Sequence, residues 1–349
     1  MKHHVNIALT GLLAASIRRA LIVTAAALAL AGCGGSGDGA AEDQVYLIKF
    51  PHVTAPGTPK GQTAQRFKEQ AEARFPGQVV VEVYPSSQLM NDDDSLEALA
   101  FGEIQMIAVS LSKFDRLTHA FQVFDLPFLF PSLAAVEGFQ AGPAGQTLLN
   151  ELTDKGFLGL AFWHNGMKQF SAPRALLVPE DADGLKFRIM ESDVLQAQVQ
   201  AIGGNPQKMA LGEVYQALQT GAIDAQENTW SNIYSSKFYE VQDYVMETNH
   251  GYIGYLVAVN PQFWQGLPQD IRTGLETVLA EVTAWGNAQA ETINQEARGK
   301  VAAEGRGEII DLTPEQLARW QEVMHPVWDQ FAGDIGAERI AAASDVSLD

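Results

Sequence analysis

The sequence has a single cysteine, Cys33, among its 349 residues. One cysteine cannot form an internal disulfide, and no other thiol remains to act as a nucleophile. The chain also lacks the His-Glu-x-x-His, Gly-x-Ser-x-Gly and phosphate-loop patterns that mark common hydrolytic and nucleotide sites. We therefore expect a protein that is not an enzyme and that has no catalytic, metal or cofactor site.

Basic residues are few as well. The chain has 23 Lys and Arg against 42 Asp and Glu, a formal net charge of −19. Three of the basic residues and none of the acidic ones fall within residues 1–32, so the remainder carries a net charge of −22. A chain this acidic, without a basic stripe, repels nucleic acid. The few basic residues on apolar strands favour a small anionic ligand in a closed pocket.

Only one apolar run comes near the length of a membrane span, and it lies at the N-terminus. A basic region precedes Ala20 to Leu30, and the run ends in Leu-Ala-Gly-Cys33. This pattern is typical of a bacterial lipoprotein signal, in which the cysteine is acylated; a plain signal peptide is the alternative. We predict a lipoprotein signal at 1–32, a flexible glycine-rich tether at 33–43, and a periplasmic protein held to a membrane through Cys33.

The first half of the folded region predicts alternating strands and helices. The expected elements are strands 44–50, 79–84 and 104–109 and helices 62–74 and 95–101. The nearly unbroken apolar strands favour a parallel sheet covered on both faces. Ligands bind beyond the C-terminal ends of such strands, which points to His52, the loop 86–88 and residues 110–113. The acids Asp92 to Asp94 are interpreted as a solvated helix start, with a metal site as the minor alternative.

The second half predicts further strands and a long helix. The expected elements are helix 134–152, strand 159–163, loop 164–168, strands 175–178 and 185–189, helices 192–202 and 214–220, strand 223–228 and helices 270–303 and 313–331. Helix 270–303 is long enough to extend over more than one lobe. The fold class is therefore α/β.

Arg188 is the most unusual residue of these strands. Leu185, Phe187 and Ile189 alternate with polar residues, so the strand packs one face on a core. A guanidinium among apolar side chains needs an anion, because it cannot lose its proton. A core carboxylate, or a stem that reaches water, is the structural explanation, and it is the simpler one on this strand alone. A carboxylate ligand held by the planar fork is the functional one.

Six short segments, in this order and spacing, resemble one known family. They are Tyr84-Pro-Ser-Ser-Gln-Leu89, Leu126-Pro-Phe-Leu-Phe130, Gly184-Leu-Lys-Phe-Arg-Ile189, Glu213-Val-Tyr-Gln-Ala-Leu-Gln-Thr-Gly221, Asp224-Ala-Gln-Glu-Asn228 and Lys237-Phe-Tyr-Glu-Val241. The resemblance is to the extracytoplasmic solute-binding proteins of tripartite ATP-independent periplasmic (TRAP) transporters. It extends over about residues 45–345.

The resemblance implies a set of ligand-binding residues. Arg188 matches the arginine that pairs with the ligand carboxylate, and Asn228 the asparagine that hydrogen-bonds to it. Lys168 matches a second basic position, and Ser110 and Lys113 align with ligand-facing positions of the other lobe. The remaining candidates for the pocket wall are Trp230, Tyr255 and His52.

Other segments resemble the branch of this family that binds four-carbon dicarboxylates. They are Asn165-Gly-Met-Lys168, Gln226-Glu-Asn-Thr-Trp-Ser-Asn232 and Asn249-His-Gly-Tyr-Ile-Gly-Tyr255. Leu211 stands where sialic-acid binders have phenylalanine, so that contact is not carried over. In this branch Arg188 with Asn228 would hold one carboxylate, and Lys168 or Lys113 the other.

The resemblance implies a two-lobed binding-protein fold that closes about a hinge over its ligand. Lobe I is predicted at 44–165 and about 254–295, and lobe II at 166–253 and about 296–349. The expected function is capture of a small organic acid such as succinate, fumarate or malate, and its delivery by a monomer to TRAP membrane subunits. A monocarboxylate binder for a 2-oxo acid or sugar acid, a ligand-presenting sensor and a secreted enzyme are the alternatives.

Overall fold

The structure is a computed structural model that describes residues 44–304 and 307–346. All of them belong to one compact unit, Asp43–Asp349. The predicted signal, the tether and Cys33 lie outside the described residues. Among the described residues, no helix is both long enough and apolar enough to span a bilayer.

The strands form three sheets of two, three and six strands. They are β1 (Tyr46–Pro51), β2 (Val79–Tyr84), β3 (Met106–Ser110), β4 (Leu158–Met167), β5 (Gln169–Ala172), β6 (Lys186–Ile189), β7 (Asn205–Lys208), β8 (Ala225–Asn228), β9 (Tyr244–Glu247), β10 (Tyr252–Val259) and β11 (Glu308–Asp311). The small sheet pairs β1 with β2 in parallel, the second has the order β3-β10-β4, and the third β11-β9-β5-β8-β6-β7.

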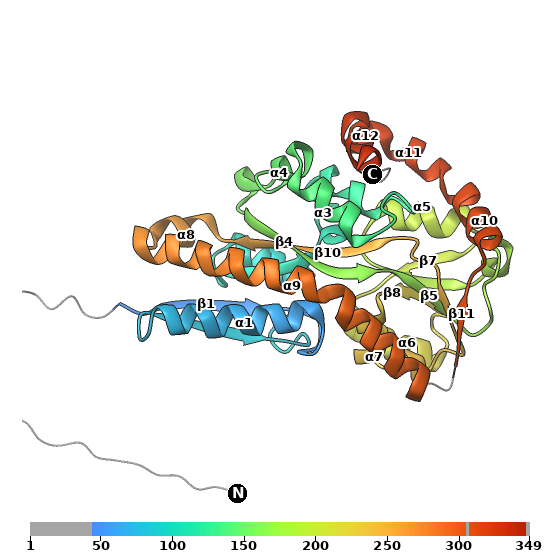
Figure 1. Ribbon diagram of the computed structural model, residues 1–349, viewed down its shortest axis with the longest axis horizontal. Helices are drawn as coiled ribbons and strands as arrows, with labels where there is room; N and C mark the ends of the chain where they lie inside the picture. The colour runs from blue at the N-terminus through green and yellow to red at the C-terminus, as the bar shows by residue number, and fades with distance from the viewer. Residues whose placement is uncertain (1–43, 305–306, 347–349) are drawn as a thin grey trace, which may run out of the picture. The chain divides into compact units, whose positions relative to one another are not determined.

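Helices cover these sheets (Figure 1). They are α1 (Pro59–Arg74), α2 (Asp92–Ala100), α3 (Leu133–Ala141), α4 (Pro143–Leu148), α5 (Asp193–Ala201), α6 (Val214–Thr220), α7 (Trp230–Ser235), α8 (Pro261–Gly266), α9 (Gln269–Glu304), α10 (Pro314–Met324), α11 (Pro326–Ile335) and α12 (Ala337–Asp345). Short 3-10 helices are η1 (Leu111–Phe114), η2 (Ala120–Asp125), η3 (Thr153–Lys155), η4 (Pro179–Ala182), η5 (Leu211–Glu213) and η6 (Phe238–Glu240).

The predicted long helix is present as α9 and connects the two halves of the unit. It packs against α1 and β4 along its first part and against α7 further on, as Figure 1 shows. Gly286 permits the close approach to α1, because a Cβ there would lie 2.2 Å from Thr63 Oγ1. The two-stranded and three-stranded sheets form one group and the six-stranded sheet the other, and α9 runs along both. This arrangement confirms the predicted two-lobed α/β fold.

The predicted lobe boundaries stay predictions. The chain leaves the β3-β10-β4 sheet between β4 and β5 and returns to it between β9 and β10. The C-terminal helices contact both halves: α11 packs on α5, whereas α12, predicted in lobe II, packs on α3 of lobe I.

Four predictions of local structure were wrong, each for a visible reason. The predicted helix 134–152 is interrupted at Gly142 and Pro143, and 313–331 is interrupted at Pro326, because proline cannot continue a helix. The predicted loop 164–168 largely continues β4, whose strand pairs with β10 as far as Met167. Residues 175–178 are apolar without being a strand, since Leu176 is buried in a connecting segment.

The predicted parallel arrangement of the first three strands holds only for β1 and β2. β3 pairs antiparallel with β10 instead. The sequence between β2 and β3 gives no sign of this, because the partner strand comes about 150 residues later in the chain. The C-terminal end of β3 still faces the same region as the ends of β1 and β2, and the site is there.

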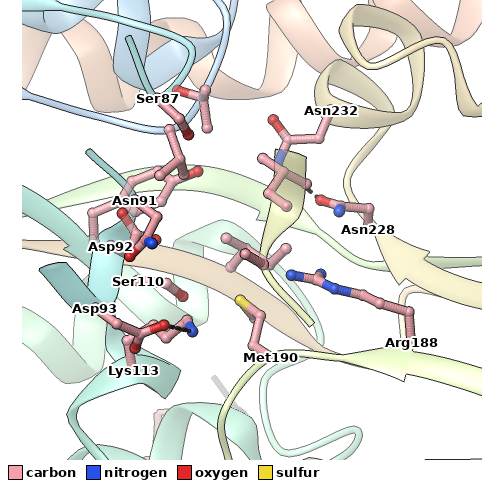
Figure 2. A pocket seen from close by; sticks show the side chains of 16 residues that line it. Ser87, Asn91, Asp92, Asp93, Ser110, Lys113, Arg188, Met190, Asn228 and Asn232 are labelled. Carbon is pink, nitrogen blue, oxygen red and sulfur yellow. Dashed lines mark hydrogen bonds and ion pairs between the residues drawn. The ribbon is translucent and has the colours of Figure 1, made fainter. Parts of the chain in front are cut away.

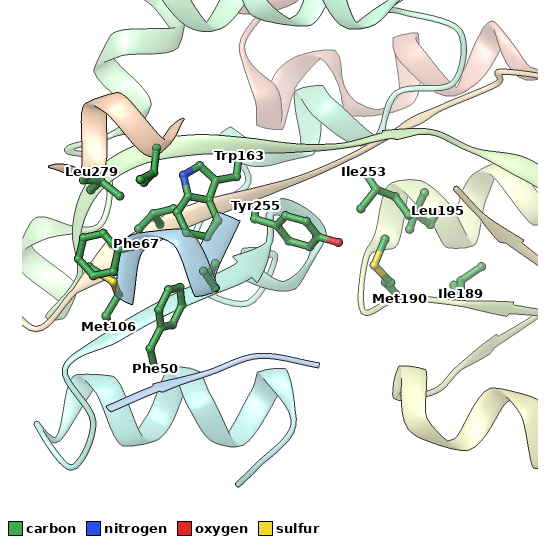
Figure 3. Packing of buried hydrophobic residues seen from close by; sticks show 14 of the residues in the cluster. Phe50, Phe67, Met106, Trp163, Ile189, Met190, Leu195, Ile253, Tyr255 and Leu279 are labelled. Atoms are coloured by element: carbon green, nitrogen blue, oxygen red, sulfur yellow. The ribbon is translucent and has the colours of Figure 1, made fainter. Parts of the chain in front are cut away.

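One continuous apolar core runs beneath both halves (Figure 3). Phe50, Phe67 and Trp163 form one end of it, and Ile189 and Leu195 the other. Tyr255 on β10 lies between these groups, with its hydroxyl end directed toward the second one. A polar atom at this position in the core already marks the neighbourhood of the site.

Candidate ligand-binding site

A cavity lies where the ends of β1, β2 and β3 face β6 and β8 (Figure 2). Its volume is about 40 Å³, counted over the positions open to the centre of a water-sized sphere. One water needs about 10–15 Å³ on this measure, so the cavity suits a few waters or a small molecule. The polar residues of the lining are Thr54, Ser87, Asn91, Asp92, Asp93, Ser110, Lys113, Arg188, Asn228, Asn232 and Tyr255.

Arg188 reaches the cavity from β6 and is 3% exposed. Its Nε and Nη2 donate to the carbonyl oxygen of Met209 at 2.9 and 2.8 Å, which fixes one edge of the guanidinium. The end of the side chain points into the cavity (Figure 2). Among the described residues no carboxylate lies at ion-pair distance from it. Burial lowers its pKa to about 10, against the opposing effect of Glu227 and Asp92. It is a buried cation without a direct counter-ion.

Asn228 ends β8 next to Arg188. Its Oδ1 accepts hydrogen bonds from the Thr229 backbone N–H at 3.1 Å and from Asn232 Nδ2 at 2.8 Å. These two donors orient the amide, so its NH₂ group remains for a ligand oxygen. Arg188 and Asn228 therefore present donors to the same cavity from adjacent strands.

Three buried oxygens in the lining lack a well-formed hydrogen bond within the described protein, although Asn232 lies close enough to Tyr255 to lower the pKa of its phenol. They are Ser110 Oγ, Asn232 Oδ1 and Tyr255 Oη. Buried polar atoms are nearly always hydrogen-bonded, so three in one cavity indicate that something polar binds there. Burial raises the pKa of Tyr255 well above its usual range, so the phenol stays protonated and can donate.

The start of α2 forms the wall opposite Arg188. Asn91 caps the helix through Oδ1, which accepts from the Asp94 backbone N–H at 2.9 Å. Asp93 pairs with Lys113 at 2.8 Å. The expected helix start is present, but its interpretation as solvated was wrong for Asp92, which is 9% exposed and lines the cavity.

Lys60 lies directly behind this wall and was not predicted. It is fully buried on α1, and its Nζ donates to the Ala108 carbonyl oxygen at 3.0 Å. The same Nζ lies 3.8 Å from the centre of the Tyr255 ring. Burial lowers its pKa to about 8, with Asp92 acting in the opposite direction. Its sequence position, just before the predicted helix, gave no sign of burial.

The loop after β2 is held in an unusual backbone conformation. Ser86 and Ser87 both have positive φ, 54° and 58°. Their backbone N–H groups donate to the carbonyl oxygens of Thr54 and His52 at 3.0 and 3.1 Å. Such strain is maintained only by the surrounding structure and is common at binding sites. Here the two hydrogen bonds join the loop after β2 to the loop after β1 and place Ser87 at the cavity.

The structure brings five of the eight predicted binding residues to this cavity: Ser110, Lys113, Arg188, Asn228 and Tyr255. His52 instead lines a neighbouring hollow beside α1, and its pKa is lowered to about 3 by burial and by Lys60. Trp230 lines a third hollow, near Arg298. Leu211, the position set aside in the sequence analysis, does line the cavity.

Lys168 lies outside the cavity and is fully buried. Its Nζ pairs with Glu227 Oε1 at 2.7 Å, and His250 and Gln198 both contact Glu227 Oε2 at 2.8 Å. Burial raises the pKa of Glu227, but Lys168 and His250 outweigh burial and hold it well below its usual range. The charge of Lys168 is thus balanced by Glu227, a partner that the sequence analysis did not identify.

The geometry defines a class of protein: a two-lobed binder that receives a small anion between its halves. The comparisons give the family. The family model described as bacterial extracellular solute-binding protein, family 7 (DctP), matches residues 50–334. The chain belongs to this family.

Related proteins with named ligands are similar over most of the chain. A C4-dicarboxylate-binding periplasmic protein of Shewanella loihica is 51% identical over 296 residues, which cover 85% of this chain and 88% of the relative. A TRAP periplasmic solute-binding protein of Shewanella oneidensis, solved with bound succinate, is 48% identical with a TM-score of 0.86, covering 87% and 99%. One from Pseudomonas aeruginosa, with bound L-malate, is 45% identical with a TM-score of 0.80, covering 81% and 99%.

Lys168 and Glu227 should behave as a structural pair. Lys168→Met leaves a buried carboxylate without its cation, so we expect a loss of roughly 3–5 kcal/mol in the free energy of unfolding at pH 8. Lys168→Met combined with Glu227→Gln should recover most of the loss, because neither charge remains. Urea unfolding measures both.

The double variant also separates structure from ligand contact. It should bind a small dicarboxylate within a few-fold of the unsubstituted protein. A stable double variant that binds none would show that Lys168 contacts the ligand directly.

Proposed function

We propose that this protein captures a four-carbon dicarboxylate of the succinate, fumarate or malate type and passes it to the membrane subunits of a TRAP transporter. The observation that carries the proposal is the buried guanidinium of Arg188, which faces a cavity and has no carboxylate partner in the described part of the chain. The ligands bound in the similar structures, succinate and L-malate, support the same chemistry. In this proposal Arg188 and Asn228 bind one ligand carboxylate.

Lys113 is the proposed partner of the second carboxylate. It comes from η1, on the opposite side of the cavity. Its side chain is buried, and its ammonium group pairs with Asp93. Lys168 is not used for this end, because its ammonium is buried on Glu227. Ser110 and Tyr255, with unpartnered oxygens, supply further hydrogen bonds. Ligand contacts from both halves would favour closure.

Arg188→Met tests the proposed carboxylate contact. The change removes the charge at similar length, and we expect succinate affinity to fall by roughly 2–5 kcal/mol, about 30-fold to several thousand-fold. Isothermal titration calorimetry measures this. Lys186→Ala is the matched control, since Lys186 lies on the same strand but donates to Gly221 outside the cavity. A folded Arg188→Met protein with unchanged affinity would make Arg188 structural.

The number of ligand carboxylates can be tested with a matched pair of acids. Butyrate has the carbon count of succinate but lacks one charge, so it would leave Lys113 without its ligand partner. A site built for a polar group rejects the analogue lacking it strongly, so we expect butyrate to bind at least about a hundredfold more weakly. Equal affinity would contradict the dicarboxylate proposal and support the monocarboxylate alternative.

We also propose that a monomer of this protein is anchored to a membrane by a lipid on Cys33. The Leu-Ala-Gly-Cys pattern supports this, and extracellular solute binding requires export. Cys33→Ser should move the protein from the membrane fraction to the soluble fraction of the cell envelope, as measured by fractionation and immunoblot. Membrane association that survives the change would exclude this anchor.

A further inference from the structure

Asp92 is an acid in a cavity that otherwise suits an anion. It is 9% exposed, begins α2 and lines the cavity opposite Arg188. Its carboxylate has neither an ion pair nor a hydrogen bond within the described part of the chain, whereas Asp93 has Lys113. A buried, unpaired carboxylate beside an incoming dicarboxylate would repel it. Something must therefore change at Asp92 when the ligand enters.

The charges that face Asp92 can be counted by element. Lys60 comes from α1, Lys113 from η1 and Arg188 from β6, while Asp93 is its neighbour on α2. With Asp92 ionised, three cations face two carboxylates and leave one excess positive charge. Lys168 and Glu227 offset each other deeper in the protein. A monoanion would neutralise the cavity, but a dianion would leave it with one excess negative charge.

We propose that Asp92 takes up one proton as a dicarboxylate binds and shares it, as a hydrogen bond, with the second carboxylate of the ligand beside Lys113. The proton comes from the solvent, the protonated Asp92 oxygen donates, and the ligand oxygen accepts. Asp92 thereby determines the ligand charge that the site accepts: a dianion binds together with one proton and a monoanion binds without one. This inference rests on the proposed dicarboxylate function.

The electrostatics of the cavity already favour protonation of Asp92. Burial raises its pKa, opposed by Lys60, Lys113 and Arg188. Those three cations are also the groups that a bound dianion would engage or neutralise. The opposing effect then weakens, while a new negative charge is added nearby, and both changes raise the pKa of Asp92 further.

Proton uptake is measured by titrating succinate at pH 6.5 in two buffers of different ionisation enthalpy. The unsubstituted protein should take up protons as succinate binds, up to one per succinate, and Asp92→Asn should take up close to none. Asp94→Asn is the matched control: it makes the same change two residues along α2, on an exposed side chain outside the cavity, and should retain the uptake. At this pH Lys60, with a pKa of about 8, is already charged and contributes little.

Asp125, among the described residues, is a second buried carboxyl group whose pKa is raised by burial, to about 6. It does not line the cavity. Uptake of the same size in Asp92→Asn as in the unsubstituted protein would assign the proton to such a group and overturn the proposal. Succinate binding with no proton uptake would overturn it too, while leaving the proposed function intact.

Affinity against pH gives a second readout. Uptake of one proton strengthens binding by up to tenfold for each pH unit of acidification, so the succinate Kd should fall between pH 8 and pH 6.5. Asp92→Asn should give a weaker dependence of Kd on pH, with the remainder due to Lys60, whose pKa is about 8. It should also bind more tightly than the unsubstituted protein at pH 8, because the repelling charge is gone. Weaker binding by Asp92→Asn at every pH would instead mean that ionised Asp92 accepts a hydrogen bond from the ligand, and this would contradict the proposal. No succinate binding by the unsubstituted protein would contradict the proposed function itself.

Discussion

The site depends on one unbalanced interaction: a guanidinium held inside the protein by a carbonyl group instead of a carboxylate. Met209 fixes the orientation of Arg188 without neutralising its charge. A neutral acceptor stabilises a buried cation much less than an anion does, so part of the desolvation cost remains. A ligand carboxylate can reduce that cost. The surrounding structure therefore holds the charged guanidinium in an orientation that an anionic ligand can reach.

The second buried network has the opposite character. Lys168, His250 and Gln198 all contact the carboxylate of Glu227, which is the arrangement expected for a structural ion pair. Gly251 is needed beside it, because a Cβ there would lie 2.4 Å from the Lys168 side chain. Glu227 directly precedes Asn228 on β8, so the closed network fixes the strand from which a binding residue projects. Lys168 is thus paired within the protein, whereas Arg188 is available to a ligand.

Much of the fold could be predicted from the sequence, because its signals are local. Period two around Arg188 gave a half-buried strand, and helical spacing over about 34 residues gave α9, which spans Gln269–Glu304. The rule that ligands bind beyond strand ends led to Ser110 and Lys113, and both line the cavity even though β3 pairs antiparallel with β10. The pairing of β3 itself was not predictable from local pattern, since it depends on a strand far along the chain.

The residues that sequence reasoning missed owe their roles to packing between distant segments. Asp92 looks like any acid at a helix start, yet it is 9% exposed and lines a cavity together with Arg188 of β6 and Tyr255 of β10. Lys60 looks like a solvated lysine until Tyr255 and Ala108 enclose its ammonium. Lys168 shows the converse: its family position suggested a ligand contact, but Glu227 is close enough to take its charge. In each case the neighbouring groups in the fold, and not the residue type alone, determine whether the charged side chain is solvated, paired or exposed to the cavity.

A crystal structure with succinate tests the central claim most directly. The account predicts one ligand carboxylate on the free edge of the Arg188 guanidinium and on Asn228 Nδ2, with the Met209 carbonyl still accepting from the opposite edge. The other carboxylate should lie beside Lys113 and Asp92. Succinate bound elsewhere, or an Arg188 side chain that has only Met209 as its partner in the complex, would contradict it.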